Sequence, residues 1–259
     1  MSGTVPRTVP GAGVSAWRGA LGSEWIKFWT VRSTWWSVVC AVGLMAFSSM
    51  VLGIDFSGDV ETGDATDGLT MARGEPALES VVIAQFGIVA LAMLLMTSEF
   101  ATGAMRLTLT ADPSRGRVLL AKTAVVGGVS VVLGAVLAAV GIAAGALALG
   151  DQGTGDAASM VGDGLVITVY VALTSVITVG VAAWIRSTAG TLSTVLSVMV
   201  ALPLILTASG TEYLPGRAGM ILLSGEDDVL HPAVAGVVLA LWAVAAQVAG
   251  WAALRRRDV

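Results

Sequence analysis

The chain contains very few histidines, cysteines and lysines. It has one histidine, His231, one cysteine, Cys40, and only two lysines, Lys27 and Lys122. A single cysteine within an apolar stretch excludes both a disulfide framework and a metal cluster of cysteines. No G-x-x-x-x-G-K-[ST] segment is present, so the sequence offers no loop that could cradle nucleotide phosphates. The sequence therefore predicts no catalytic, cofactor-binding or metal-binding residue.

An intramembrane serine protease is the enzyme class to which the remaining polar residues could belong. The segment Thr207–Gly210 is similar to the serine motif of rhomboid proteases, and His231 is the only histidine available as a base. His231 directly precedes Pro232, at the expected start of a helix, where its side chain would be exposed. A working dyad needs both groups within hydrogen-bond reach in a preorganised site. We therefore expect His231 to cap a helix.

Charged residues with a more informative spacing lie in Thr97–Lys122, TSEFATGAMRLTLTADPSRGRVLLAK. Glu99, Gly103 and Arg106 would share one helical face, but Glu99 and Arg106 are too far apart to pair with each other. Each is expected to meet another helix or another chain. The dipeptide Asp112-Pro113 predicts an N-cap and a first helical residue, so the segment should form a helix, a sharp break and a second helix. A basic loop that only fixes topology is the alternative.

Six apolar stretches must position this segment, and each is about long enough to span a membrane. At roughly 1.5 Å per residue, about 20 residues cross a hydrocarbon core of roughly 30 Å. The stretches are Trp35–Ile54, Val81–Thr97, Thr123–Gly150, Gly164–Ile185, Ala189–Ser209 and Pro232–Leu254. Hydrophobic residues make up 56% of the chain and charged residues 12%, unlike soluble proteins. The expected fold class is an all-α polytopic membrane protein whose transmembrane domain covers residues 35–259.

Charge is distributed unevenly over the two sides of such a protein. Twelve of the 14 Lys and Arg residues would lie on one side, and only Arg73 and Arg217 on the other. Basic residues near spans stay cytoplasmic, which predicts a multi-pass protein of the cell membrane with both termini in the cytoplasm. The basic face would attract the anionic headgroups of the lipid bilayer. The net charge of −4 argues against nucleic acid as a partner.

Residues 1–34 precede the first span, and we expect them to include an amphipathic helix that lies on the membrane surface. Glu24 and Lys27 fall away from its apolar face. That face carries aromatic residues at helical spacing, namely Trp17, Trp25, Phe28 and Trp29. Trp favours the headgroup level, and basic residues would hold the helix against the membrane. A break is expected near residues 30–34. An aromatic belt with no further role is the alternative.

Small residues and prolines predict how the spans pack. The third span carries a stripe of small residues, Gly134, Ala138, Gly141 and Gly145, which we interpret as a packing surface. Pro203 should bend the fifth span. The apolar run Met220–Leu223 is too short to span and is expected either to dip into the outer leaflet or to cover helix ends.

Three segments resemble the type-2 permeases of ABC transporters. E-F-x-x-G-x-x-R at Glu99–Arg106 and P-S-R-G-R-V-L-L-A-K at Pro113–Lys122 are similar to the intracellular loop of that family. S-E-W-x-K-x-x-x-V-R-S-T-W-W at Ser23–Trp36 is similar to the N-terminal elbow of its small bacterial members. Together with the six-span layout, the resemblance covers nearly the whole chain. Ala101 departs from it, because relatives often carry a basic or polar residue there.

The resemblance implies a permease subunit of an export system in which separate ATP-binding subunits hydrolyse ATP. It implies a homodimer, or a heterodimer with a related permease, with the second and fifth spans nearest the dimer axis. The surface that couples the permease to the ATPase is implied to include Glu99, Gly103, Arg106, Pro113, Arg115 and Lys122. The alternative is a membrane protein with no transport of its own, such as an immunity protein.

Overall fold

The described part of the chain contains six helical segments of membrane length. The computed structural model describes residues 12–62, 70–111, 114–206, 210–225 and 230–256. Within these residues, six segments are long and apolar enough to cross a membrane, with mean hydropathies between 1.8 and 2.5. They are α2 (Arg32–Thr62), α3 (Glu75–Thr102), α5 (Arg115–Leu149), α6 (Ala157–Ile185), the segment that begins with α7 (Thr188–Leu196), and α10 (Pro232–Arg256). The predicted all-α fold is confirmed, and the protein is a multi-pass membrane protein.

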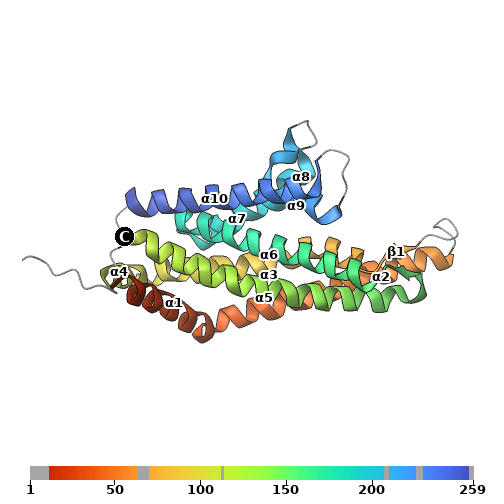
Figure 1. Cartoon of the computed structure of the whole chain (residues 1–259), viewed down its shortest axis with the longest axis horizontal. Helices are drawn as coiled ribbons and strands as arrows, with labels where there is room; N and C mark the ends of the chain where they lie inside the picture. The colour runs from red at the N-terminus through yellow and green to blue at the C-terminus, as the bar shows by residue number, and fades with distance from the viewer. Residues whose placement is uncertain (1–11, 63–69, 112–113, 207–209, 226–229, 257–259) are drawn as a thin grey trace, which may run out of the picture.

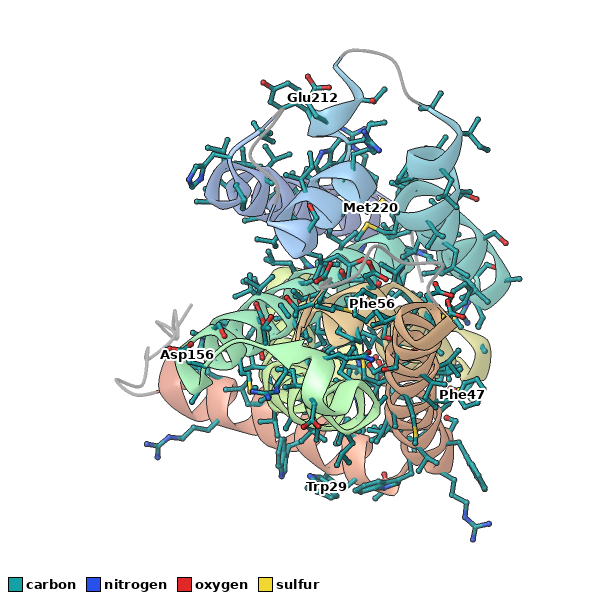
Figure 2. All side chains as sticks on the ribbon, turned by 90° about the vertical axis from the view of Figure 1, so that its right-hand side faces the viewer. Trp29, Phe47, Phe56, Asp156, Glu212 and Met220 are labelled. Atoms are coloured by element: carbon teal, nitrogen blue, oxygen red, sulfur yellow. The ribbon has the colours of Figure 1, made fainter. Side chains whose placement is uncertain are left out.

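The spans form two groups that run side by side along the long axis (Figure 1). Helices α2, α3, α5 and α6 pack together, while α7, α9 (Pro215–Ser224) and α10 lie against α6. The end-on view shows the same two groups, one above the other (Figure 2). In the most apolar window of α3, 72% of the residues are buried, against 22% in the fifth span. The second span is thus largely enclosed by its own chain, whereas the fifth span is not.

Close contacts at glycine hold α10 against α6. A Cβ on Gly250 of α10 would lie 2.7 Å from the carbonyl oxygen of Gly180 on α6, and a Cβ on Gly180 would lie 2.5 Å from the carbonyl carbon of Ala246. Only a residue without a side chain permits this approach. On α5, Gly134 comes similarly close to α6 and Gly141 to α2. The small residues of the third span therefore pack inside the chain, as predicted.

The fifth span changes its helix type just before Pro203. Helix α7 continues as a π-helical turn, Ser197–Ala201, and then as α8 (Leu202–Ile205). Proline has no N–H to donate to the preceding turn, and a π turn is one way in which a helix accommodates the missing hydrogen bond. The distortion expected at Pro203 is present in this form. A Cβ on Gly216 of α9 would lie 2.6 Å from the carbonyl oxygen of Val198, so α9 packs directly on the π turn.

The short apolar run near residue 220 belongs to α9, which has 10 residues and cannot span a membrane. It contacts α6, α10 and the π turn. Its buried residues are Pro215, Gly216, Ala218, Gly219, Leu222 and Leu223. This burial favours the second of the two expectations, a helix that covers the spans of its own chain. The 3-10 turn Thr211–Tyr213 precedes it.

At the end of the bundle opposite the C-terminus, two connections pair briefly (Figure 1). Strand β1 (Met71–Ala72) lies parallel to β2 (Gly153–Thr154), which follows the 3-10 turn Gly150–Gln152. Arg73 donates a hydrogen bond from Nη1 to the carbonyl oxygen of Gly155, at 3.2 Å. The elements at this end carry Asp59, Glu75, Asp151 and Asp156, so we refer to it as the acidic end, and to the opposite end, near the C-terminus in Figure 1, as the basic end.

Helix α1 (Ala12–Thr30) lies at the basic end, and α2 begins at Arg32, so the predicted break is present at Val31. Trp17, Trp25 and Trp29 are exposed, as expected for an aromatic face turned to lipid. Phe28, by contrast, is 6% exposed and belongs to the core of the bundle. Its assignment to the exposed face was wrong. Apolar spacing identifies a helix face, but it does not tell whether lipid or protein covers each residue on it.

Candidate functional site

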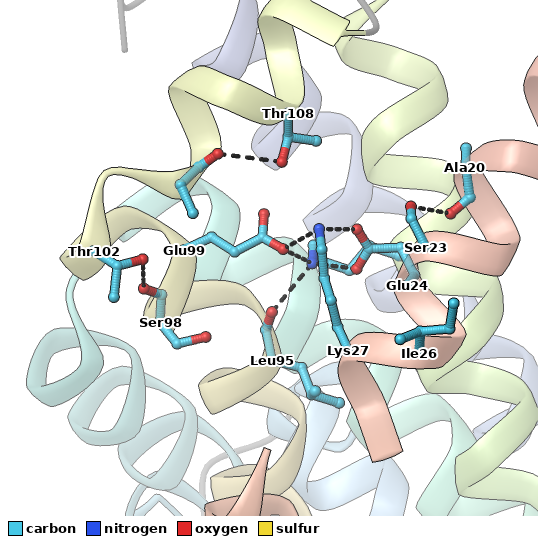
Figure 3. A network of polar contacts seen from close by, with 12 residues as sticks. Ala20, Ser23, Glu24, Ile26, Lys27, Leu95, Ser98, Glu99, Thr102 and Thr108 are labelled. Atoms are coloured by element: carbon cyan, nitrogen blue, oxygen red, sulfur yellow. Dashed lines mark hydrogen bonds and ion pairs between the residues drawn. The ribbon is translucent and has the colours of Figure 1, made fainter. Parts of the chain in front are cut away.

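Four charged side chains from three helices meet inside the basic end (Figure 3). Glu24 and Lys27 come from α1, Glu99 from α3 and Lys122 from α5. The Nζ of Lys122 donates to Glu24 Oε2 at 2.5 Å, to Glu99 Oε1 at 2.9 Å and to the carbonyl oxygen of Leu95 at 3.1 Å. The Nζ of Lys27 donates to Glu24 Oε1 at 2.8 Å and to Glu99 Oε1 at 2.7 Å. We refer to these four residues as the charge cluster.

The charge cluster is electrically balanced and largely buried. The side chain of Lys122 is 2% exposed, and those of Glu24 and Glu99 are 7% and 8% exposed. Buried charges persist only where their partners replace water, and here each lysine contacts both glutamates. Burial lowers the pKa of Lys27, but its hydrogen bonds and its attraction to Glu24 and Glu99 outweigh this effect, so that its pKa is raised. Both lysines of the chain are thus used to join α1 to α3 and α5.

Glycine ends the helix that carries Glu99. Gly103 has a φ of 72° and a ψ of 3°, and its N–H donates to the carbonyl oxygen of Phe100. This left-handed conformation favours glycine and terminates α3. Helix α4 (Ala104–Ala111) then begins in a new direction. The single helical face expected from Glu99 to Arg106 is therefore interrupted at Gly103.

Helix α4 is anchored on one side and exposed on the other. Met105 is 1% exposed and is part of the core, whereas Leu107 is 75% exposed. Arg106 is also exposed. An apolar side chain and an arginine thus stand next to each other on a short helix outside the bundle. An exposed arginine on a helix is suited to contact another protein, because arginine is enriched among the residues that dominate binding energy at interfaces.

The structure separates the residues of the expected coupling surface. Glu99 and Lys122 are interior residues, and Arg115 reaches α10, where its Nη1 donates to the carbonyl oxygen of Leu254. Gly103 and Arg106 remain on the surface. Pro113, and with it the expected Asp112 cap, lies outside the described residues, and the described N-cap of α5 is Ser114. The accessible part of the expected surface is therefore centred on α4.

Sequence reasoning missed Glu24 as a member of the site. Glu24 and Lys27 had been recognised only as residues turned away from the aromatic face of α1. A signal was available, because both residues share that side of the helix and carry opposite charges. The residue that binds Glu24 could not be identified from the sequence, since Lys122 is 98 positions away.

Arg186 was missed as well. It ends α6 with a φ of 62°, an uncommon conformation for a residue with a side chain. Its Nη2 donates to the carbonyl oxygen of Ala253 at 3.2 Å, and its guanidinium carbon lies 5.3 Å from the centre of the Phe100 ring. Arg186 thereby joins the end of α3 to α6 and α10. The signal in the sequence was its position as the single charged residue between the fourth and fifth spans.

Of the two remaining polar candidates, only His231 lies among the described residues. His231 accepts a hydrogen bond at Nδ1 from the backbone N–H of Ala233, at 3.2 Å, so it caps α10 as predicted. Ser209, the proposed nucleophile of a protease, lies outside the described residues. Among the residues that the structure describes, no group of three or more His, Cys, Asp or Glu side chains could hold a metal ion.

Comparison of the chain with protein-family models and with curated proteins gave no match.

Proposed function

We propose that the chain is the permease subunit of an ABC-type export system, with ATP hydrolysed by a separate ATP-binding subunit. The observation that carries the proposal is α4, an exposed helix joined to the buried charge cluster through Gly103. The resemblance of Glu99–Arg106 and Pro113–Lys122 to the intracellular loop of type-2 permeases supports the same assignment.

In this proposal, α4 transmits movement of the ATPase to the spans. Arg106 and Leu107 contact the ATPase, while Met105 holds α4 to the bundle. Movement of α4 acts on the last turn of α3, where Glu99 is bound to Lys27 of α1 and Lys122 of α5. Separating a buried charge from its partners costs several kcal/mol, so the three helices would move together.

The proposal has consequences for orientation and assembly. The basic end and both termini face the cytoplasm, and the protein resides in the cell membrane, because basic residues near spans are retained on that side. A second permease chain, identical or related, completes the transporter. The fifth span is suited to this contact because only 22% of its most apolar window is buried within the chain.

The test uses the chain purified from its native membranes together with an ATP-binding protein. Arg106→Ala and Leu107→Asp should weaken this association and lower the stimulated ATPase rate, because truncating a desolvated interface charge costs roughly 2–5 kcal/mol. Arg18→Ala is the matched control, since it removes an exposed charge from the same end without touching α4. Its ATPase rate should equal that of the unmodified chain.

Two results would contradict the proposal. One is an ATPase rate that is unchanged by both α4 substitutions. The other is a chain that is purified from its native membranes without any ATP-binding protein, which would favour a non-transporting membrane or immunity protein.

A further inference from the structure

A groove opens between α5, α6 and α10 and extends to the basic end. It encloses about 560 Å³, and its lining includes Leu119, Leu120, Leu173, Val176, Val244 and Trp251. Along α10 it extends from Ala240 to Trp251, a rise of about 16 Å at roughly 1.5 Å per residue. This shape is that of a slot for an extended hydrocarbon chain.

The one strongly polar side chain in the groove is already paired. Gln247 accepts a hydrogen bond at Oε1 from Thr123 Oγ1, at 2.9 Å, and its Nε2 donates to the carbonyl oxygen of Val176, at 2.8 Å. The groove therefore presents an apolar surface and does not depend on water or on a polar ligand to satisfy Gln247.

Positive charge gathers where the groove reaches the basic end. The guanidinium carbon of Arg255 lies 4.7 Å from the centre of the Trp251 ring, at the groove wall. Arg117 lies one helical turn before Leu120 of the lining. The N-terminus of α5 adds partial positive charge, and Arg115 offsets the negative C-terminus of α10 by donating to its last carbonyl oxygens.

Trp251 marks the level at which the apolar groove meets this charge. Its ring is 41% exposed. A Cβ on Gly116 of α5 would lie 3.0 Å from Trp251 Nε1, so the absence of a side chain at position 116 makes room for the indole at the mouth of the groove. Indole rings favour the boundary between hydrocarbon and headgroups.

We propose that this groove binds an anionic phospholipid, with one acyl chain along α10 and the headgroup phosphate held by Arg117 and Arg255. An apolar slot inside the membrane takes hydrocarbon, and basic pockets between spans select anionic headgroups. Arginine binds phosphate through several N–H donors at once. This inference does not depend on the chain being a permease.

The experiment measures quenching of Trp251 by lipids with brominated acyl chains. The full chain is reconstituted in phosphatidylcholine that contains a minor fraction of either brominated phosphatidylglycerol or brominated phosphatidylcholine. The difference between the chain and its Trp251→Phe variant isolates the Trp251 signal. Brominated phosphatidylglycerol should quench Trp251 more strongly, and the ratio of the two quenching efficiencies reports the preference in each variant.

Three variants locate the site. Arg117→Gln with Arg255→Gln should lower the preference, by about five-fold for each arginine. Arg18→Gln with Arg32→Gln removes the same charge from exposed positions at the same end and should leave the preference unchanged. Val244→Trp fills the groove from a position that is 61% exposed, and it should abolish the preference although the arginines remain.

The proposal is overturned if the two lipids quench Trp251 of the unmodified chain equally. Weak quenching by both lipids would show that a second copy covers the groove, and it would overturn the proposal too. A loss of preference in the Arg18 and Arg32 control as large as in the Arg117 and Arg255 variant would assign the effect to diffuse surface charge.

Discussion

Lys122 has the most enclosed charge of the residues that form the charge cluster. Its Nζ contacts Glu24, Glu99 and a backbone carbonyl oxygen, and its side chain is 2% exposed. Removing this cation would leave two buried carboxylates with only Lys27 between them. The loss of one partner from a buried ion pair costs more than the pair itself contributes, because the remaining charge is desolvated without compensation.

We therefore expect Lys122→Met to lower the free energy of unfolding by roughly 3–5 kcal/mol. Lys27→Met is the matched control, because Lys27 contacts the same two glutamates but is 38% exposed. Water can replace part of its interaction, and its removal should cost about 1 kcal/mol or less. Unfolding of both variants in detergent, followed by tryptophan fluorescence, measures the difference. Equal losses of unfolding free energy in the two variants would show that burial does not determine how much each lysine stabilises the protein.

At the scale of elements, α10 is held mainly by its packing against α6. It lies against α6 and α9, with the lipid groove on its α5 side, and only 22% of its most apolar window is buried. At Gly180 and Gly250 the two helices approach so closely that neither position has room for a Cβ. Packing of this kind is a main source of helix association in lipid, where hydrophobic burial contributes little.

Gly250→Ala should destabilise the protein by about 1–3 kcal/mol, because the new methyl group would lie 2.7 Å from the carbonyl oxygen of Gly180 and force the helices apart. Gly128→Ala on α5 provides the comparison. No atom lies within 4 Å of the position that its Cβ would take, so its effect should be within about 0.5 kcal/mol. Thermal unfolding of both variants measures the two changes in stability. A comparable loss of stability in Gly128→Ala would refute the packing explanation.

At the scale of the whole molecule, opposite charges gather at the two ends of a long bundle. Helices α1 and α4 and the end of α10 lie at the basic end, while the paired strands lie at the acidic end (Figure 1). If the positive-inside rule decides the orientation, α4 and the charge cluster face the cytoplasm. The proposed contact between α4 and an ATP-binding subunit depends on this orientation.

Cysteine labelling in a Cys40→Ala background tests the orientation. Ala158→Cys is exposed at the acidic end and should react with a membrane-impermeant maleimide in intact cells. Thr110→Cys is exposed on α4 and should react only after the membrane is permeabilised. Reaction of Thr110→Cys in intact cells would show that the orientation is the opposite one, in which α4 is out of reach of a cytoplasmic ATPase.

The six spans could be predicted from the amino-acid sequence, because apolar runs of membrane length are stable only when every backbone group is paired within a helix. Their limits were less well predicted. Helix α5 begins at Arg115 and α2 ends at Thr62, both well outside the predicted apolar stretches. Helical hydrogen bonding continues beyond the hydrocarbon core, so hydropathy marks the membrane and not the end of the helix. The sequence also identified His231 as a cap and Pro203 as a point of distortion.

The partners inside the bundle were decided by the tertiary structure alone. Glu99 binds Lys27 and Lys122, which are 72 and 23 positions away, and no spacing rule within one helix predicts such pairs. The sequence also did not show which side of α1 faces the bundle. Phe28 is buried and Trp29 exposed, although both are apolar neighbours. In a membrane, lipid and protein interior are both apolar, so hydrophobicity cannot distinguish the outside of a helix from the inside, and only packing against α3 and α5 does.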